Sequence, residues 1–183
     1  MTQEDWFRIA CEGLILEGEA GLTLHALTTR AGVTHGSFYH HFKGQAGFVT
    51  AFLEHLERRA FIDVPAAEDH DLATPVGAQE ALRRLVEIIA AEDLHLEAAV
   101  RRWAQSNPTV AVVVNEIDAR RAELLCRLFL AATGDVARAA YLARLNGALY
   151  LGAVHSRPPI QGAEYARMAT DLARLLAEEG QVS

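Results

Sequence analysis

The sequence predicts an all-α protein of about nine helices, and three observations support this class. Alanine, leucine, arginine and glutamate are abundant, while runs of β-branched residues are few, a composition that favours helix. Apolar residues recur at helical spacing along most of the 183 residues. N-cap residues, glycines and prolines divide the chain into segments of ordinary helix length. At 51% hydrophobic and 22% charged, the chain has the composition of a globular protein with a real core.

Four helices are expected before residue 62, each bounded by a start or stop residue. Thr23 is placed to cap the second helix, and Gly32 ends it after about two turns. Thr34 is placed to cap the third helix in the same way. Phe48 and Phe52 belong to the apolar stripe of the fourth. The expected ranges are 4–17, 24–31, 35–42 and 45–61.

The stretch 62–78 interrupts this helical pattern. It carries two prolines and an acidic cluster, which predicts an exposed linker. We therefore expect an N-terminal domain over 1–61 and a C-terminal domain over 62–183. Pro108 at a first helical position and Asp135 as an N-cap mark two of the later helices. The expected ranges in this part are 79–92, 94–106, 108–133, 136–154 and 163–179.

Charge is distributed unevenly along the chain. The net charge is −7, which does not indicate a general affinity for nucleic acid. Between Glu19 and Glu54, however, there is no acidic residue, and this window contains Arg30, Lys43 and four histidines. Such a window could face a polyanion. It could equally be the neutral surface of a small packed subdomain.

The two short helices around Gly32 form a helix-turn-helix pattern with the helix that precedes them. In this pattern the second short helix offers its first turn to base edges in a major groove. Gly36 would allow a close approach, and His35 and Ser37 are short hydrogen-bonding residues beside it. Phe38 and Phe42 lie four residues apart, so both are expected to face inward and anchor the helix. The alternative is a three-helix packing module that does not contact DNA.

The N-terminal motif resembles the DNA-binding half of TetR-type transcriptional regulators. The resemblance lies in the order T-L-x-x-L…A-G-V-T-x-G-S-F-Y-x-H-F-K, from Thr23 to Lys43, and in the preceding WFRIACEGLILEGEAGLT. It implies an N-terminal helix-turn-helix domain and a C-terminal helical domain for ligand binding and dimerisation. It also implies contacts with double-stranded DNA. The implied base contacts are His35, Gly36, Ser37 and His25, and the implied phosphate contacts are Thr23, Thr34, Tyr39, His41 and Lys43.

Two features depart from the family pattern. Gln45 occupies a place where the family often has lysine or arginine, and the N-terminus lacks a basic arm. Binding would then depend more on histidines, which gain charge as the pH falls toward 6. We therefore expect DNA affinity to rise between about pH 8 and pH 6.

The resemblance further implies a homodimer formed through helices near 135–154 and 162–179, and an unknown small-molecule effector. Gly147 and Gly152 would allow close helix approach, although burial within one chain is the alternative. Some of the C-terminal helices are expected to line the interior of their domain. Side chains that are apolar with one polar end, on such helices, suit a mostly apolar ligand site. They could also be satisfied core or interface residues. The candidate pocket residues are Trp103, Asn146, Tyr150 and His155.

Other classes of protein find little support in the sequence. It has no glycine-rich phosphate loop, no HExxH and no serine elbow, so we expect no enzyme and no cofactor. The spacing of His35, His40 and His41 does not match metal ligands on one helical face. Two distant cysteines, an acidic N-terminus and no long apolar run predict a cytoplasmic protein without a membrane partner. The competing function is a helical ligand- or partner-binding protein that has lost specific DNA recognition.

Overall fold

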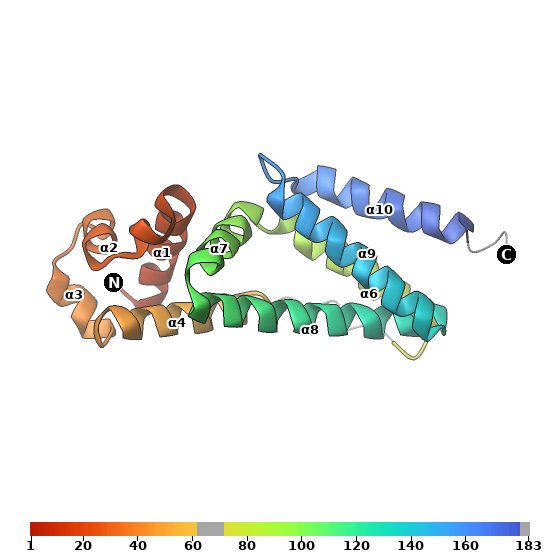
Figure 1. Ribbon diagram of the computed structural model, residues 1–183, viewed down its shortest axis with the longest axis horizontal. Helices are drawn as coiled ribbons and strands as arrows, with labels where there is room; N and C mark the ends of the chain where they lie inside the picture. The colour runs from red at the N-terminus through yellow and green to blue at the C-terminus, as the bar shows by residue number, and fades with distance from the viewer. Residues whose placement is uncertain (62–71, 180–183) are drawn as a thin grey trace. The chain divides into compact units, whose positions relative to one another are not determined.

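The computed structural model describes residues 1–61 and 72–179, and within these ranges it is all-helical (Figure 1). Nine α-helices and one short 3-10 helix make up the described chain, which confirms the predicted fold class. The helices are α1 (Gln3–Glu17), η1 (Gly18–Leu22), α2 (Leu24–Ala31), α3 (His35–His41), α4 (Gly44–Arg59), α6 (Pro75–Ala91), α7 (Leu94–Ser106), α8 (Pro108–Thr133), α9 (Val136–His155) and α10 (Gly162–Glu179).

One part of the predicted linker is wrong. Residues 75–78 form the first turn of α6, where Thr74 is the N-cap and its side chain accepts a 3.1 Å hydrogen bond from the Gly77 amide. Pro75 occupies the first helical position, where a missing N–H is tolerated, so this proline starts a helix instead of breaking one. Residues 62–71 of the predicted linker lie outside the described residues. The other helix ends lie within two residues of their predicted positions.

The contacts divide the chain into two compact units. The first comprises residues 1–61 and 95–117, and the second comprises the described parts of 62–94 and 118–183. Helix α8 therefore contributes its residues up to Ile117 to the first unit and the rest to the second. The predicted division into a DNA-binding domain over 1–61 and a regulatory domain over 62–183 concerns function and stays a prediction.

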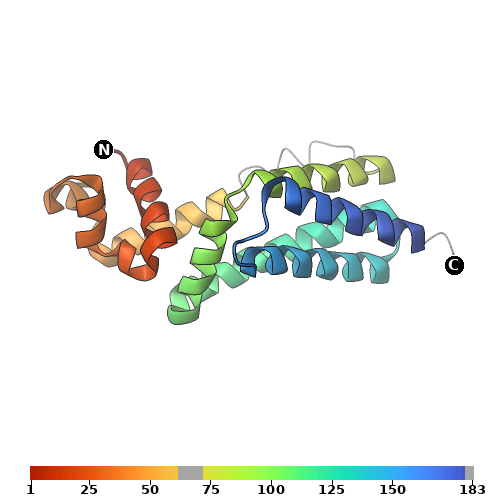
Figure 2. The same cartoon turned by 90° about the horizontal axis from the view of Figure 1, so that it is seen from above.

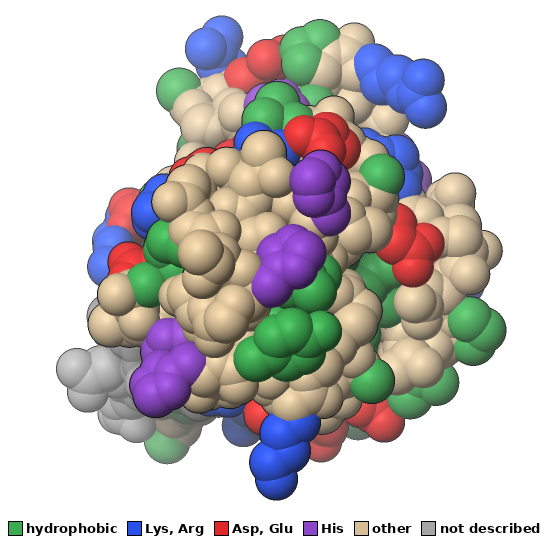
Figure 3. All heavy atoms as spheres, turned by 90° about the vertical axis from the view of Figure 1, so that its left-hand side faces the viewer, with side chains coloured by type: hydrophobic (Ala, Val, Ile, Leu, Met, Phe, Trp, Pro, Cys, Tyr) green, Lys and Arg blue, Asp and Glu red, His purple; other side chains and the backbone are tan. Residues whose placement is uncertain are grey.

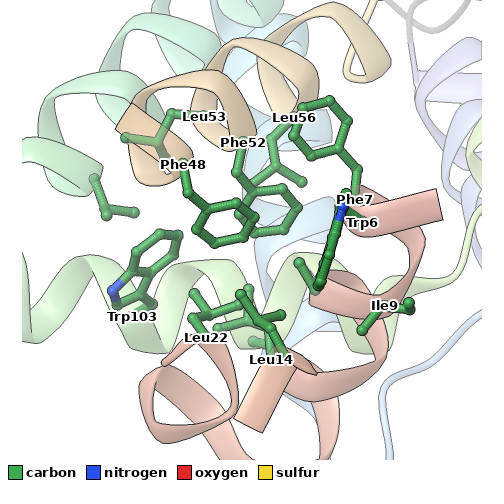
Figure 4. Packing of buried hydrophobic residues seen from close by; sticks show 14 of the residues in the cluster. Trp6, Phe7, Ile9, Leu14, Leu22, Phe48, Phe52, Leu53, Leu56 and Trp103 are labelled. Carbon is green, nitrogen blue, oxygen red and sulfur yellow. The ribbon is translucent and has the colours of Figure 1, made fainter. Parts of the chain in front are cut away.

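The core of the first unit is aromatic. Trp6 meets Phe38 edge to face at 5.4 Å between ring centroids. Phe48 stacks on Phe52 at 5.7 Å, and Phe52 stacks on Trp103 at 6.3 Å. Figure 4 shows the rings of Phe48 and Phe52 between Trp103 and Trp6. Since burying one aromatic ring stabilises a fold by roughly 1.5–3 kcal/mol, this cluster fixes α1, α3, α4 and α7 in one unit.

Helix α1 and η1 approach each other so closely that side chains are excluded. A Cβ on Gly13 would lie 2.7 Å from the Gly21 carbonyl oxygen, and a Cβ on Gly21 would lie 2.3 Å from the Gly13 carbonyl oxygen. Both distances are shorter than any ordinary carbon–oxygen contact. The close crossing places Leu14 and Leu22 together in the core.

The second unit has an aliphatic core. Ala81 and Leu85 of α6 pack with Leu124 and Leu128 of α8. Helix α10 packs against both α6 and α9, as Figure 2 shows. Small and aliphatic side chains make up this cluster between α6 and α8, and Tyr165 of α10 is also buried in this unit.

Candidate nucleic-acid interface

Helix α2, which a tight turn joins to α3, is capped at both of its ends. The Thr23 side chain accepts a 3.3 Å hydrogen bond from the Ala26 amide and donates one of 3.1 Å to the Ala20 carbonyl. At the other end of α2, Gly32 adopts the left-handed conformation, with φ 66°. Its amide and that of Val33 donate to carbonyls of the last turn, including Thr28. A residue with a Cβ would be strained at Gly32, so the glycine sets the angle at which α3 leaves α2.

Helix α3 is fixed by one buried face. Phe38 is fully buried and Phe42 nearly so, which confirms that these two side chains face inward. Phe38 lies 5.5 Å from Phe48, and Phe42 lies 5.2 Å from the same ring of α4. Trp6 and Phe7 of α1 complete this contact, so α3 and its C-cap Phe42 are held by three aromatic partners on two other helices. Its opposite face is left at the surface.

The residues predicted to contact bases lie on this outer face. His35 and Gly36 are exposed in the first turn of α3, Ser37 is half-buried beside them, and His25 is exposed at the start of α2. The structure therefore presents all four to solvent on the helix-turn-helix. Their contact with bases stays a prediction.

The predicted phosphate contacts are also accessible. Tyr39, with 58% of its surface exposed, meets Phe38 edge to face. Thr34 precedes α3 as its N-cap, yet its hydroxyl makes no capping hydrogen bond. Lys43 is exposed, while His41 is half-buried. The Thr23 hydroxyl is used within the fold as the cap of α2, which gives this residue a structural role whether or not it also contacts DNA.

The fold itself does not require a glycine at position 36. Gly36 is not among the glycines with positive φ, and a Cβ there would meet only the Thr34 hydroxyl oxygen, at an ordinary 3.6 Å. Alanine in a helix is more stable than glycine by roughly 0.5–1 kcal/mol. Glycine at position 36, in the exposed first turn of α3, is therefore less stabilising than alanine would be, and it leaves room where a methyl group would fit.

Positive charge near this face is limited, and part of it is committed. Arg30 forms an ion pair with Glu17 of α1, and its side chain is only 22% exposed. The Gln45 amide donates a 2.7 Å hydrogen bond to the Leu22 carbonyl, so it ties α4 to η1. Gln3 donates a 3.4 Å hydrogen bond to the His41 carbonyl and so joins α1 to the end of α3. The sequence pattern does not predict these contacts, because the two residues that each contact joins lie between 13 and 38 positions apart in the chain.

The predicted ligand-pocket residues fall into both units. Trp103 is 3% exposed in the aromatic core of the first unit, where its indole N–H has no hydrogen-bond partner. Asn146 and Tyr150 are half-buried on α9 in the second unit, and His155 is exposed at the end of that helix. The Arg121 guanidinium lies over the Tyr150 ring at 5.2 Å, while the Asn146 amide donates to the Leu142 carbonyl. The role of these residues in ligand binding stays a prediction.

Across 1–61 and 72–179, no group of three or more histidine, cysteine or acidic side chains is arranged to hold a metal ion. In the same ranges, no helix combines the length and the hydrophobicity needed to cross a bilayer. Burial raises the pKa of the Cys11 thiol to about 11, so this half-buried cysteine stays protonated at neutral pH.

The first unit of this all-helical chain carries a helix-turn-helix whose second helix has an exposed outer face, the arrangement by which DNA-binding proteins place a helix in a major groove. Residues 9–52 match the family described as bacterial regulatory proteins, tetR family. The match confirms the resemblance to this family that Thr23–Lys43 carries. Among curated proteins, the sequence finds no significant match.

Solved structures of transcriptional regulators share the fold over nearly the whole chain. A TetR/AcrR family member superposes with a TM-score of 0.73 at 17% identity, covering 94% of this chain and 98% of that one. A regulator from Saccharomonospora viridis in complex with choline gives 0.71 at 16%, covering 94% and 95%. A regulator from Streptomyces coelicolor A3(2) gives 0.58 at 22%, covering 93% and 95%. At these identities the likeness shows a shared fold and nothing further.

Proposed function

We propose that the protein is a cytoplasmic, ligand-responsive repressor that binds a palindromic DNA operator as a homodimer. The observation that carries the proposal is the outer face of α3. Aromatic contacts of Phe38 and Phe42 hold the helix from behind, while His35, Gly36 and Ser37 occupy its exposed first turn. In a dimer, two such helices would lie about 34–36 Å apart, or a multiple of this distance, on successive major grooves.

The glycine at position 36 supports a close approach to DNA. Because the folded chain leaves room for a side chain there, the residue is better explained by a partner than by folding. We propose that the backbone of this turn lies against base edges, with His35 and Ser37 donating or accepting hydrogen bonds beside it. Thr34, Tyr39 and the remaining predicted phosphate contacts would set the register of the helix.

An exposed stripe on α9 supports the proposed homodimer. Tyr141 is 60% exposed and Leu151 is 37% exposed, and small residues lie between and beyond them at helical spacing. On α10, Met168 is 38% exposed. An apolar surface of this kind is stabilised when a second copy covers it, and two helices from each copy would form a four-helix bundle.

The effector is proposed to act through the C-terminal domain. One structure similar in fold contains choline, which makes a small-molecule ligand plausible for chains of this architecture. Effector binding would shift the population of dimers toward a conformation in which the distance between the two α3 helices no longer fits the operator. Helix α4 is the proposed link, and the stack of its Phe52 on Trp103 joins it to α7 within the first unit.

The test is a DNA-binding measurement with a glycine variant. Fluorescence anisotropy on the DNA upstream of the gene, compared with a random duplex, should give specific binding with a steep salt dependence. Gly36→Ala should lower specific affinity at least about tenfold, equal to about 1.4 kcal/mol, while the melting temperature stays equal or rises. Gly47→Ala is the matched control, since its Cβ would meet only the Lys43 Cβ at 3.5 Å.

The second candidate function is a helical ligand- or partner-binding protein without specific DNA recognition. The observation that favours it is the limited charge around α3, where Arg30 is paired with Glu17 and Gln45 is bonded to Leu22. Under this alternative, the wild-type protein would not distinguish the upstream DNA from a random duplex at any salt concentration. Gly36→Ala would then change nothing but stability.

A further inference from the structure

Histidine is the main basic residue type on the outer surface of α2 and α3. Four of the eight histidines of the chain lie in the acid-free window between Glu19 and Glu54. His25, His35 and His40 are exposed, and His41 is half-buried with its ring 5.1 Å from that of His40. Figure 3 looks onto the side of α2 and α3 and shows several histidine side chains in the foreground. We call these four residues the histidine face.

The permanent cations of the same window contribute less. The Arg30 guanidinium is held by the Glu17 carboxylate and is mostly covered. Lys43 is exposed at the start of α4. A DNA backbone carries one negative charge per phosphate, so a face with so little permanent charge binds it weakly unless further charge is supplied. Histidine is the residue type that can supply this charge between pH 8 and pH 6.

The acidic groups of the neighbouring elements are engaged elsewhere. On α1, the Asp5 carboxylate accepts hydrogen bonds from the Thr2 amide at 2.7 Å and the Thr2 hydroxyl at 3.0 Å. The Glu4 carboxylate lies 3.4 Å from Nδ1 of His55. On η1, Glu19 accepts hydrogen bonds from Ser106 and Asn107 of the first unit.

Uncharged and basic groups complete the surroundings of the histidine face. Gln3 of α1 donates to the His41 carbonyl, and Tyr39 and Lys43, which flank His40 and His41 in the sequence, are exposed. Arg8 of α1 is paired with Glu12, and Arg30 of α2 is paired with Glu17. The groups that surround the histidines therefore leave their charge available to a phosphate.

We propose that the histidine face makes operator binding sensitive to pH, so that the protein binds DNA more tightly as its histidines gain protons. This inference rests on the proposed DNA-binding function and adds a regulation to it. When a protonated histidine binds a DNA phosphate, a counterion is released from the DNA, as it is when lysine or arginine binds. A neutral histidine releases none. The regulator would then respond to acidification in addition to its effector.

The last turn of α3 is the part of this face best placed to act. His40 and His41 lie at the C-terminal end of the helix, where the helix dipole favours positive charge. Neither belongs to the base-reading first turn, so both can be changed without altering His35, Gly36 or Ser37. His41 also has its backbone fixed by Gln3, which does not depend on the imidazole ring.

The experiment measures operator and random-duplex binding by anisotropy at pH 6, 7 and 8 at constant ionic strength, with salt titrations at both ends. The affinity of the wild-type protein should rise at least about tenfold from pH 8 to pH 6. The slope of log K against log salt should steepen by about one for each histidine that gains a proton at a phosphate. Circular dichroism at each pH confirms that the protein is folded.

Two pairs of substitutions identify the residues responsible. His40→Gln with His41→Gln should remove most of the rise at low pH while retaining preference for the operator. His40→Lys with His41→Lys should give tight binding at pH 8 and a flat profile, because lysine stays charged throughout this range. His95→Gln, on α7, is the control and should keep the wild-type profile.

The outcomes separate this inference from the function on which it rests. Specific binding that does not change between pH 6 and pH 8 overturns the pH response. A glutamine pair that keeps the full rise overturns the assignment of that response to His40 and His41. Either result leaves the proposed regulator intact. Absence of specific binding at every pH overturns the proposed function itself, and the inference with it.

Discussion

The two units of the molecule are stabilised by different kinds of core. In the first unit, rings from α1, α3, α4 and α7 meet at fixed angles, such as the 88° between Trp6 and Phe38. In the second, the cluster between α6 and α8 consists of Ala81, Leu85, Leu124 and Leu128, none of which is aromatic. The difference teaches that ring contacts fix the direction of α3, which carries the proposed DNA contacts, whereas the second unit carries the apolar stripe that we propose a second copy covers.

The largest expected effect comes from removing one ring of the aromatic core. Phe38→Ala should destabilise the first unit by about 3–5 kcal/mol, because a fully buried ring leaves a cavity, and it should abolish operator binding. Leu128→Ala, fully buried in the second unit, should cost about 2–5 kcal/mol there. Both tryptophans belong to the first unit, so fluorescence follows its unfolding alone, while circular dichroism follows both units.

Urea titrations with both probes test whether the units unfold separately. If they do, Phe38→Ala lowers the fluorescence midpoint and Leu128→Ala lowers only the circular dichroism midpoint. Coincident shifts of both midpoints in Leu128→Ala would instead indicate a single cooperative fold, and the distinction between two cores would lose its thermodynamic meaning.

The next effect concerns the exposed stripe of the second unit. Leu151→Asp should raise the dimer dissociation constant at least about 100-fold, equal to about 2.7 kcal/mol, since a charge would be buried at the proposed interface. Sedimentation velocity over a concentration series gives the dissociation constant. Val76→Asp is the control, because Val76 is 75% exposed on α6, a helix that the proposed interface does not include. An unchanged dimer in Leu151→Asp would place the interface elsewhere.

A smaller effect compares one helix cap in each unit. The Asn107 side chain accepts hydrogen bonds from the Thr109 and Val110 amides at the start of α8, and it also donates to Glu19. The Asp135 side chain caps α9 alone, accepting a 3.0 Å hydrogen bond from the Arg138 amide. Asp135→Ala should therefore cost about 1 kcal/mol and Asn107→Ala about 1–2 kcal/mol. Equal losses, measured by urea unfolding, would mean that the contact with Glu19 contributes nothing.

The smallest effect is a pH dependence of stability from His55. Burial lowers the pKa of His55, whose ring stacks on Phe7 at 4.6 Å. The folded state therefore binds the His55 proton less tightly than the unfolded chain does. The contribution of His55 to the free energy of unfolding is complete above about pH 6.5 and is lost as the pH falls toward the lower pKa of the folded state. His55→Gln should show a smaller loss of stability between pH 7 and pH 5.5 than the wild type. An identical loss in both proteins would assign the effect to other groups.

His55 and the histidine face are thus expected to respond to acid in opposite ways. Acidification should weaken the fold slightly through His55 while strengthening DNA binding through His40 and His41. Measuring stability and affinity on the same samples separates the two effects.

Much of the first unit could be predicted because its signals are local. Thr23 and Gly32 bound α2 where the sequence places them, and the spacing of Phe38 and Phe42 predicts the buried face of α3. Helix caps and the buried face of one helix depend on residues within a few positions of each other, so local backbone geometry is enough to predict them. The start of α6 was missed because a proline at a first helical position resembles a helix breaker.

Contacts between distant segments could not be predicted in the same way. Nothing in the sequence pairs Gln45 with the Leu22 carbonyl, or brings residues 95–117 into the unit formed by 1–61. Trp103 illustrates the limit most clearly. An amphipathic ring on a buried face suits a ligand site and a core equally well, and only the position of Phe52 shows that this one lies in an aromatic core.

The crossing of α1 and η1 at Gly13 and Gly21 makes a prediction about mutational tolerance. Every other amino acid carries a Cβ, which would collide with the opposing carbonyl oxygen at either position. In a complete substitution library, these two codons should accept no missense change, even when selection is for soluble folded protein and no DNA is present. Gly36 should behave in the reverse manner, tolerant under selection for folding and intolerant under selection for repression. Glycine would then be required for folding at Gly13 and Gly21 and for DNA recognition at Gly36.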